Sequence, residues 1–279
     1  MDDITKKKLS VDACRIRMAV IEGTYNAKSG HPGGSLSIAD ILAYLYFDKM
    51  NIDPARPDMP DRDRLVLSKG HAAPALYGAL AYRGFFPVED IKTLRKPDSY
   101  LQGHPNMNLI PGVDMSTGSL GQGISAACGM ALGSKYKGDA FKVYTILGDG
   151  EIEEGEVWEA AMFAGNKGLD CLTAFIDYNG LQIDGTVEEV DSPEPIADKF
   201  RAFNWNVIEI DGHDFDQIED AVTRADALKG PTAIVCRTVK GKGVSFMENS
   251  VGWHGKAPNE EEYNTAMAEL NAQLAALEA

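Results

Sequence analysis

The chain is poor in cysteine and has no spacing typical of a zinc site or a disulfide frame. Its four cysteines, Cys14, Cys128, Cys171 and Cys236, are scattered through apolar stretches, and no two form a Cys-x-x-Cys pair. We expect them to be small, reduced core residues of an intracellular protein.

Long hydrophobic runs and basic residues are also scarce. No stretch approaches the ~18 apolar residues that a membrane-spanning helix needs, and the opening residues, MDDITKKKLS, lack an apolar signal region. We therefore expect a cytoplasmic protein with no membrane partner. Asp and Glu number 42 against 27 Lys and Arg, so the net charge is -15, which argues against nucleic acid as a partner. An anionic substrate would have to be bound by a local cluster of cations.

Two glycine-containing turns carry the strongest pattern in the sequence. Asp149 lies in Gly-Asp-Gly after the apolar run 141–147, and Asn179 lies thirty positions further on, after the apolar run 171–178. Residues 155–167 between them have the apolar periodicity of a helix. Strand, helix and strand of these lengths predict a right-handed parallel crossover. Ligands of such units bind beyond the carboxyl ends of the strands, where both turns are expected to lie.

The chemistry of these turns favours a divalent metal. A carboxylate and a carboxamide oxygen are hard ligands suited to Mg²⁺, which leaves coordination positions open for phosphate oxygens. Four glutamates crowd the start of the helix between the turns and would repel a bare pyrophosphate: Glu151, Glu153, Glu154 and Glu156. The alternative is that Asp-Gly and Asn-Gly are ordinary turn dipeptides and that the acids only complement the helix dipole.

The rest of the chain predicts one large α/β domain, since 279 residues at 44% hydrophobic content can bury a full core. We expect a parallel sheet with helices on both faces over residues 1–258. Residues 259–279 are expected to be a helical tail of the same domain that starts with a capping box of Asn259 and Glu262. Further helices are predicted at 10–27, 36–48, 72–84, near 89–95, 121–135 and 215–228, further strands at 64–67, 206–210 and 232–237, and loops at 51–63 and 184–195.

Four of the five histidines lie in turns rich in glycine or proline, namely His31, His71, His104 and His254. If these turns converge at one edge of the sheet, their imidazoles can bind an anion or relay protons near neutral pH. A solvated loop position is the alternative for each of them. His213 lacks this turn context, and we interpret it as structural or exposed.

Several long stretches, in order along the chain, resemble transketolase within the superfamily of thiamine diphosphate enzymes. The Gly-Asp-Gly turn, the acid-rich helix start and Asn179 resemble the thiamine diphosphate motif of that superfamily. The stretches that resemble transketolase itself are SGHPGGSLSIADIL (29–42), DRDRLVLSKGHAAPALYGAL (61–80), GHP (103–105), STGSLGQGISAACGMAL (116–132), GDGEIEEGEVWEA (148–160), KGKG (240–243) and WHGKAP (253–258). The resemblance implies the thiamine diphosphate-binding fold.

The resemblance also implies roles for individual residues. Asp149, Asn179 and the carbonyl of Leu181 would bind Mg²⁺, or Ca²⁺ or Mn²⁺ in its place. The contacts to thiamine diphosphate would come from Lys69, His71, Gly118, Ser119, Leu120, Gly150, Glu151, Asn179, Lys240 and His254.

The same resemblance places the substrate beside the cofactor. His104 would bind the donor ketose, and His31 and His254 would assist proton transfer, which makes these three histidines both catalytic and substrate-binding. Lys256 would lie near the substrate entrance, and Glu154 would meet its counterpart at a subunit interface.

Whole-chain transketolases are about twice as long, and no segment here matches their pyrimidine-binding domain. We therefore expect the N-terminal subunit of a split transketolase, inactive alone and completed by a C-terminal subunit, in a heterotetramer with two of each chain. It would transfer a two-carbon ketol unit between sugar phosphates, as in the pentose phosphate pathway. The alternatives are a transketolase for an uncommon sugar phosphate, a deoxyxylulose phosphate synthase-like enzyme, a chain like the α subunit of a 2-oxo acid dehydrogenase, and a non-catalytic cofactor scaffold.

Overall fold

The computed structural model describes residues 1–279 and is built around a parallel sheet of five strands. The strand order is β1-β2-β3-β5-β4, and every neighbouring pair is parallel. The strands are β1 (Arg64–Leu67), β2 (Val143–Gly148), β3 (Leu172–Tyr178), β4 (Asn206–Asp211) and β5 (Thr232–Arg237). Every residue of β2 and β3 is buried, as expected of central strands covered on both faces.

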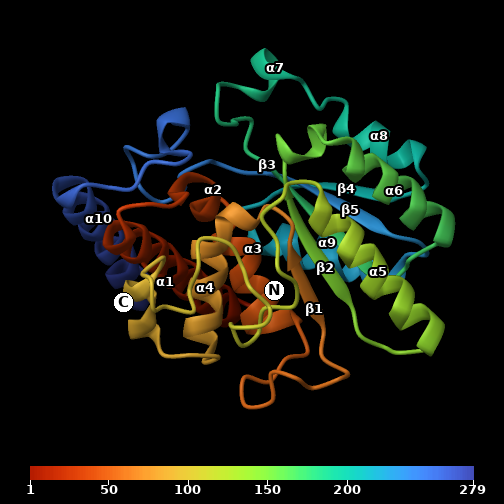
Figure 1. Cartoon of the computed structure of the whole chain (residues 1–279), viewed down its shortest axis with the longest axis horizontal. Helices are drawn as coiled ribbons and strands as arrows, with labels where there is room; N and C mark the ends of the chain where they lie inside the picture. The colour runs from red at the N-terminus through yellow and green to blue at the C-terminus, as the bar shows by residue number, and fades with distance from the viewer.

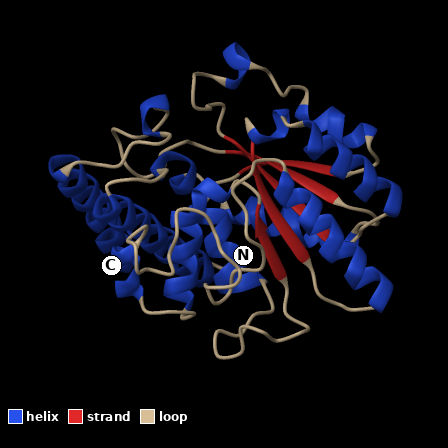
Figure 2. Cartoon of the chain, in the orientation of Figure 1, coloured by secondary structure: helices blue, strands red, loops and turns tan.

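Helices cover both faces of this sheet, as predicted (Figures 1 and 2). One face carries α1 (Asp3–Ala27), α3 (Ala39–Tyr44), α4 (Ala73–Arg83) and α9 (Phe215–Ala227), and the other carries α5 (Gln122–Lys137), α6 (Gly155–Lys167) and α8 (Ile196–Ala202). Strand β2 shows why two cores form, since Tyr144 and Ile146 pack in one and Val143 and Leu147 in the other. This alternation is the two-residue period of a strand.

The crossover that joins the two turns is confirmed. Strand β2 leads through a single 3₁₀ turn at Glu151–Glu153 into α6, and α6 leads into β3. Strands β2 and β3 pair directly, with Gly148 opposite Asp177. The turns after these strands therefore lie side by side at the carboxyl edge of the sheet.

The tail forms α10 (Glu260–Glu278), which packs along α1 at the left of Figure 1. The predicted capping box is present, with the Asn259 side chain accepting from the Glu262 amide at 2.9 Å. Ala266 and Leu270 are wholly buried in the core around α1. No helix of the structure combines the length and the apolar character needed to cross a membrane.

Three predicted helices have different limits. The predicted helix 10–27 begins at Asp3, because Asp2 caps it by accepting from the Thr5 amide. The predicted helix 36–48 is instead α2 (Pro32–Leu36), α3 and a π-helical turn at Leu45–Lys49, since Pro32 starts a helix earlier than the apolar pattern does. The segment near 89–95 is a 3₁₀ helix at Val88–Thr93.

Two short helices were not predicted. The acidic segment 184–195 contains α7 (Val187–Val190). A capping box of Thr186 and Glu189 starts this helix. Helix α8 follows it and buries Ile196 and Phe200 against the face of the sheet that α5 and α6 cover. Both helices are shorter than two and a half turns, so their apolar pattern is too brief to identify from sequence.

Candidate active site

A cavity of about 300 Å³ opens at the carboxyl edge of the sheet, beyond β2 and β3. Most of its lining residues are among those that the sequence singles out. These are His31, Lys69, His71, Gly118, Leu120, Asp149, Gly150, Glu151, Asn179, Leu181, Lys240 and His254. The cavity therefore gathers loops that are far apart in the sequence.

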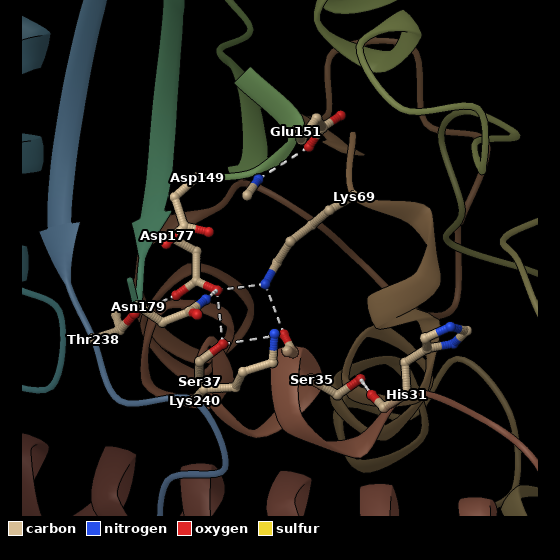
Figure 3. A network of polar contacts seen from close by, with 12 residues as sticks. His31, Ser35, Ser37, Lys69, Asp149, Glu151, Asp177, Asn179, Thr238 and Lys240 are labelled. Carbon is tan, nitrogen blue, oxygen red and sulfur yellow. Dashed lines mark hydrogen bonds and ion pairs between the residues drawn. The ribbon is translucent and has the colours of Figure 1, made fainter. Parts of the chain in front are cut away.

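The first group in this cavity is a buried ion pair between Lys69 and Asp177. Lys69 follows β1 and Asp177 lies near the end of β3, and Nζ is 2.5 Å from Oδ2. Figure 3 shows the Lys69 side chain pointing at this carboxylate. Ser37 and Asn179 also donate to Oδ2, and Thr238 donates to Oδ1. Burial alone would raise the pKa of Asp177, but Lys69 and these hydroxyl donors hold it below its ordinary value.

The predicted metal ligands meet beside this pair. The Asp149 oxygens accept from the amides of Gly150 at 2.9 Å and Gly180 at 2.6 Å, which joins the two turns. Asp149 is 2% exposed and has no cationic side chain in salt-bridge contact. Burial and the neighbouring Asp177 raise the pKa of Asp149 to about 7. A buried carboxylate without a counter-ion fits a bound divalent cation.

Lys240 supplies a second indication that this place suits a cation. Its ammonium group donates to the Leu181 carbonyl at 2.9 Å, the same oxygen that is expected to bind the metal. Burial lowers the pKa of Lys240 to about 8, so the group is still charged at pH 7. Asp149, Asn179 and Leu181 thus supply hard oxygen donors, and one of them, the Leu181 carbonyl, already binds a cationic group.

Three histidines form a triangle at the other side of the cavity. The ring centroids of His31, His71 and His254 are 5.2 to 5.5 Å apart. Burial, helped by neighbouring cations, lowers the pKa of His31 and of His254 to about 4 and that of His71 well below its usual value. All three rings are therefore neutral at pH 7, and each can donate and accept one hydrogen bond.

The proton on His254 can be placed from its partner. Lys240 Nζ is 3.1 Å from His254 Nδ1, and a charged ammonium can only donate. Nδ1 is therefore the acceptor, and the ring carries its proton on Nε2. This leaves Nε2–H as the donor of this ring.

Two loops approach each other closely behind the histidines. A Cβ atom on Gly70 would lie 2.7 Å from the Gly118 nitrogen, so only glycine allows the loop after β1 to reach the loop before α5. Gly118 itself has φ +146 and lies against the His104 ring. Leu120 is 37% exposed beside it at the mouth of the cavity, and Ser119 is exposed.

Four predicted residues do not line the cavity in this chain. His104 and Ser119 are exposed on its rim side, and Lys256 pairs with Glu262 while covering the Trp253 ring. Glu154 is exposed at the start of α6. By contrast, Glu151 reaches the cavity, but its carboxylate accepts internally from Ser68, Gly121 and Gly148.

Sequence reasoning missed several residues of the site. Asp177 lies within the apolar run 171–178 and has no motif of its own. The available signal is that a single acid in a buried apolar strand needs a charged or hydrogen-bonding partner. Gln182 and Ile183 line the cavity from the loop after β3, and Gln182 donates to Glu153 at 2.7 Å. Gly34 lines it as well and accepts from Lys69 at 2.7 Å.

The sequence matches the family model described as "Transketolase, thiamine diphosphate binding domain" over residues 6–274. The chain belongs to this transketolase family. The chain is 51% identical to the 6-deoxy-6-sulfo-D-fructose transketolase subunit SqwG of Clostridium sp. (strain MSTE9), over 92% of this chain and 94% of that one. It is 41% identical to one of the subunits of the apulose-4-phosphate transketolase of Phocaeicola vulgatus, over 97% of this chain and 96% of that one.

Solved transketolase structures have the same fold. The transketolase of Campylobacter jejuni superposes with a TM-score of 0.90 at 31% identity, over 99% of this chain and 46% of that chain. The chain thus spans about half the length of such transketolases. It is a thiamine diphosphate-binding domain of the transketolase type, and the predicted fold is confirmed.

Proposed function

We propose that this chain is the N-terminal subunit of a two-chain transketolase that transfers a ketol unit from a ketose phosphate, or a ketose with another anionic group, to an aldose phosphate. The observation that carries this proposal is the oxygen set of Asp149, Asn179 and Leu181 beside three neutral histidines in one cavity. A diphosphate site and a polyol site next to each other are what ketol transfer requires.

Asp149, Asn179 and the Leu181 carbonyl would hold Mg²⁺, which anchors the diphosphate. Thiamine diphosphate, when bound, supplies the carbanion chemistry that breaks and re-forms the carbon–carbon bond of the sugar. Lys69, His71 and Lys240 provide positive charge and N–H donors toward the phosphate oxygens. The positive charge of the metal would then offset the negative charge of the glutamates at the start of α6.

The remaining histidines would serve the sugar. His254 presents Nε2–H as a donor, while His31 has Nδ1 buried without a partner. Neutral rings of this kind can take a proton from one hydroxyl and return it to another. His104, at the rim, would bind the donor ketose, and Lys256 would lie at the entrance.

We further propose that a second polypeptide completes the site. Support comes from the two relatives named as subunits, whose lengths this chain nearly matches, whereas the Campylobacter transketolase is more than twice as long. Exposed apolar side chains suit a partner surface. They lie at the cavity mouth (Leu120 and Ile183), on α6 (Met162 and Phe163) and in the loop that follows His104 (Met107 and Leu109). Glu154 would lie at this interface, in an assembly with two copies of each chain in the cytoplasm.

The substrate class is proposed from the same two relatives. One is named for 6-deoxy-6-sulfo-D-fructose and the other for apulose 4-phosphate. An uncommon anionic sugar is therefore the favoured donor, ahead of the ordinary pentose phosphates. Enzymes of the deoxyxylulose phosphate synthase or 2-oxo acid dehydrogenase type would instead turn over pyruvate or another 2-oxo acid.

The test is a reconstitution with the companion chain. The chain is tagged in its host, co-purified with whatever subunit it retains, and assayed with thiamine diphosphate, Mg²⁺ and an aldose phosphate as acceptor. The donors to compare are 6-deoxy-6-sulfo-D-fructose, xylulose 5-phosphate and pyruvate. Ketol transfer from either sugar by the pair, but not by this chain alone, supports the proposal. Activity of the single chain, or turnover of pyruvate only, rejects it.

A further inference from the structure

A chain of largely buried polar contacts lies outside the cavity, among residues that do not line it. Arg17 on α1 pairs with Asp40 on α3, with Nη2 2.5 Å from Oδ2, and both side chains are less than 10% exposed. His213 follows β4, and its Nδ1 lies 2.7 Å from the same Asp40 oxygen. The backbone amide of Val239 then donates to His213 Nε2 at 2.9 Å.

This chain of contacts ends at residues 238–240, which place the Lys240 ammonium group in the cavity. Val239 lies between Thr238, which donates to Asp177, and Lys240, which donates to Leu181 and contacts His254. Figure 3 shows Thr238 and Lys240 among the residues that surround Asp177 in the cavity. The backbones of Thr238 and Lys240 are held by Tyr178 and Asn249. The amide of Val239 between them donates to His213 alone, so this bond fixes the middle of the segment.

We propose that His213 is a positioning residue for the cofactor: it anchors Val239 and thereby aims Thr238 and Lys240 at the metal-diphosphate site. This inference rests on the proposed function, because it assumes that thiamine diphosphate occupies the cavity. The effect is transmitted through Lys240, since His213 itself does not line the cavity.

The contacts of His213 also define its tautomer. A backbone N–H can only donate, so Nε2 must be unprotonated to accept from Val239. Nδ1 therefore carries the proton and donates to Asp40, whose second oxygen is held by Arg17 at 3.2 Å. Arg17 and Asp40 thus keep the ring in the one form that can accept from Val239, as carboxylates do for histidines that must present a chosen nitrogen.

The first experiment compares two substitutions at His213 with a control in the same groove. His213→Phe keeps a ring but cannot accept from Val239, whereas His213→Gln keeps an acceptor for Val239 and a donor for Asp40. Gln217→Ala is the control, because Gln217 lines the same surface groove and bonds only to Asp211 and Asp214. Calorimetry measures thiamine diphosphate binding in Mg²⁺ by each variant together with the co-purified companion subunit, and hydrogen exchange measures the protection of the Val239 amide.

We expect His213→Phe to weaken thiamine diphosphate binding by roughly tenfold, because residues that orient a ligand-binding side chain usually contribute at least this much. The same substitution should expose the Val239 amide to exchange. His213→Gln and Gln217→Ala should stay within about twofold of the wild type. Unchanged binding by His213→Phe, or equal losses in His213→Phe and His213→Gln, would overturn the inference. If the wild type binds no thiamine diphosphate, the proposed function fails as well.

A second measurement needs no variant and covers the case in which His213→Phe does not fold. Nitrogen NMR of the wild-type protein reports which imidazole nitrogen of His213 carries the proton. The inference requires Nδ1–H with a bare Nε2. A spectrum that shows Nε2 protonated at pH 7 would exclude the bond from Val239 and the positioning role with it.

Discussion

Lys69 and Asp177 form an ion pair in which both side chains are at most 2% exposed, with Nζ 2.5 Å from Oδ2. The pair joins the loop after β1 to the end of β3. It is the interaction that holds two walls of the cavity together, and Asp177 gathers Ser37, Asn179 and Thr238 around it. The site is therefore organised by a carboxylate that is not expected to touch the metal.

Removing the cation from this pair should destabilise the protein strongly. Lys69→Met leaves the Asp177 carboxylate buried without its counter-ion, and we expect a loss of about 3–5 kcal/mol in the free energy of unfolding. Urea denaturation of the cofactor-free chain measures it. Lys256→Met is the control, because the Lys256–Glu262 pair is on the surface and should contribute about 0–1 kcal/mol. Similar losses in both variants would show that burial of the Lys69 pair is not what matters.

The buried histidines should make the protein less stable on mild acidification. The pKa of His31 is about 4 in the folded chain, against an ordinary value of 6.5, because burial disfavours the imidazolium ion; His254 behaves likewise. Between these two pH values the unfolded chain binds protons on these histidines that the folded chain does not, so their contribution to the free energy of unfolding decreases as pH falls from 6.5 toward 4. Asp149, whose pKa is raised to about 7, contributes in the opposite direction, so the comparison of variants isolates the histidine term. Urea denaturation at about pH 7 and about pH 5 should show a smaller decrease for His31→Asn than for the wild type. Equal decreases would contradict the burial of His31 as a neutral ring.

His104 should affect the sugar and not the cofactor. It is exposed at the rim and does not line the cavity. In the reconstituted pair, we expect His104→Ala to raise the KM of the donor ketose about tenfold, which is the loss of one uniform binding contact. Thiamine diphosphate affinity, measured by calorimetry, should not change. An unaltered donor KM rejects the role, and weakened cofactor binding would place His104 at the diphosphate instead.

The tail helix should depend on its cap. The Asn259 side chain satisfies the Glu262 amide at the start of α10, so Asn259→Ala should cost about 1 kcal/mol of stability. Asn271→Ala, in the exposed interior of the same helix, should change stability by less than about 0.5 kcal/mol. Thermal denaturation of both variants measures the difference. If both behave alike, α10 does not contribute to global stability through its cap.

The strands and the crossover could be predicted because their signals are local. Residues 143–148 and 172–178 are apolar runs buried on both faces, and glycine-containing turns end them. Helix limits were less predictable where the helix surface is polar. The Lys-rich first turns of α1 lack an apolar stripe, the early start of α2 depends on Pro32, and the break before α3 lies at Ser37, which donates to Asp177.

The candidate site divides in the same way. Asp149, Asn179 and the histidine turns could be proposed because each stands at a recognisable turn or motif. Partners that meet only through the fold left no local signal: Asp40 and His213 are 173 positions apart, and Lys69 and Asp177 are 108 apart. These contacts exist only in the folded chain, where the sheet brings the segments that carry them together.

The central claim is that this chain binds thiamine diphosphate through a metal held by Asp149. The most direct test is calorimetric titration of thiamine diphosphate into the purified chain with its companion subunit, in Mg²⁺ and in EDTA, for the wild type and Asp149→Asn. Glu153→Gln is the matched control, as it removes an acid from the adjoining 3₁₀ turn that does not line the cavity. We predict binding by the wild type and by Glu153→Gln in Mg²⁺ only, and none by Asp149→Asn. Equal binding by all three proteins, with or without the metal, would contradict the account.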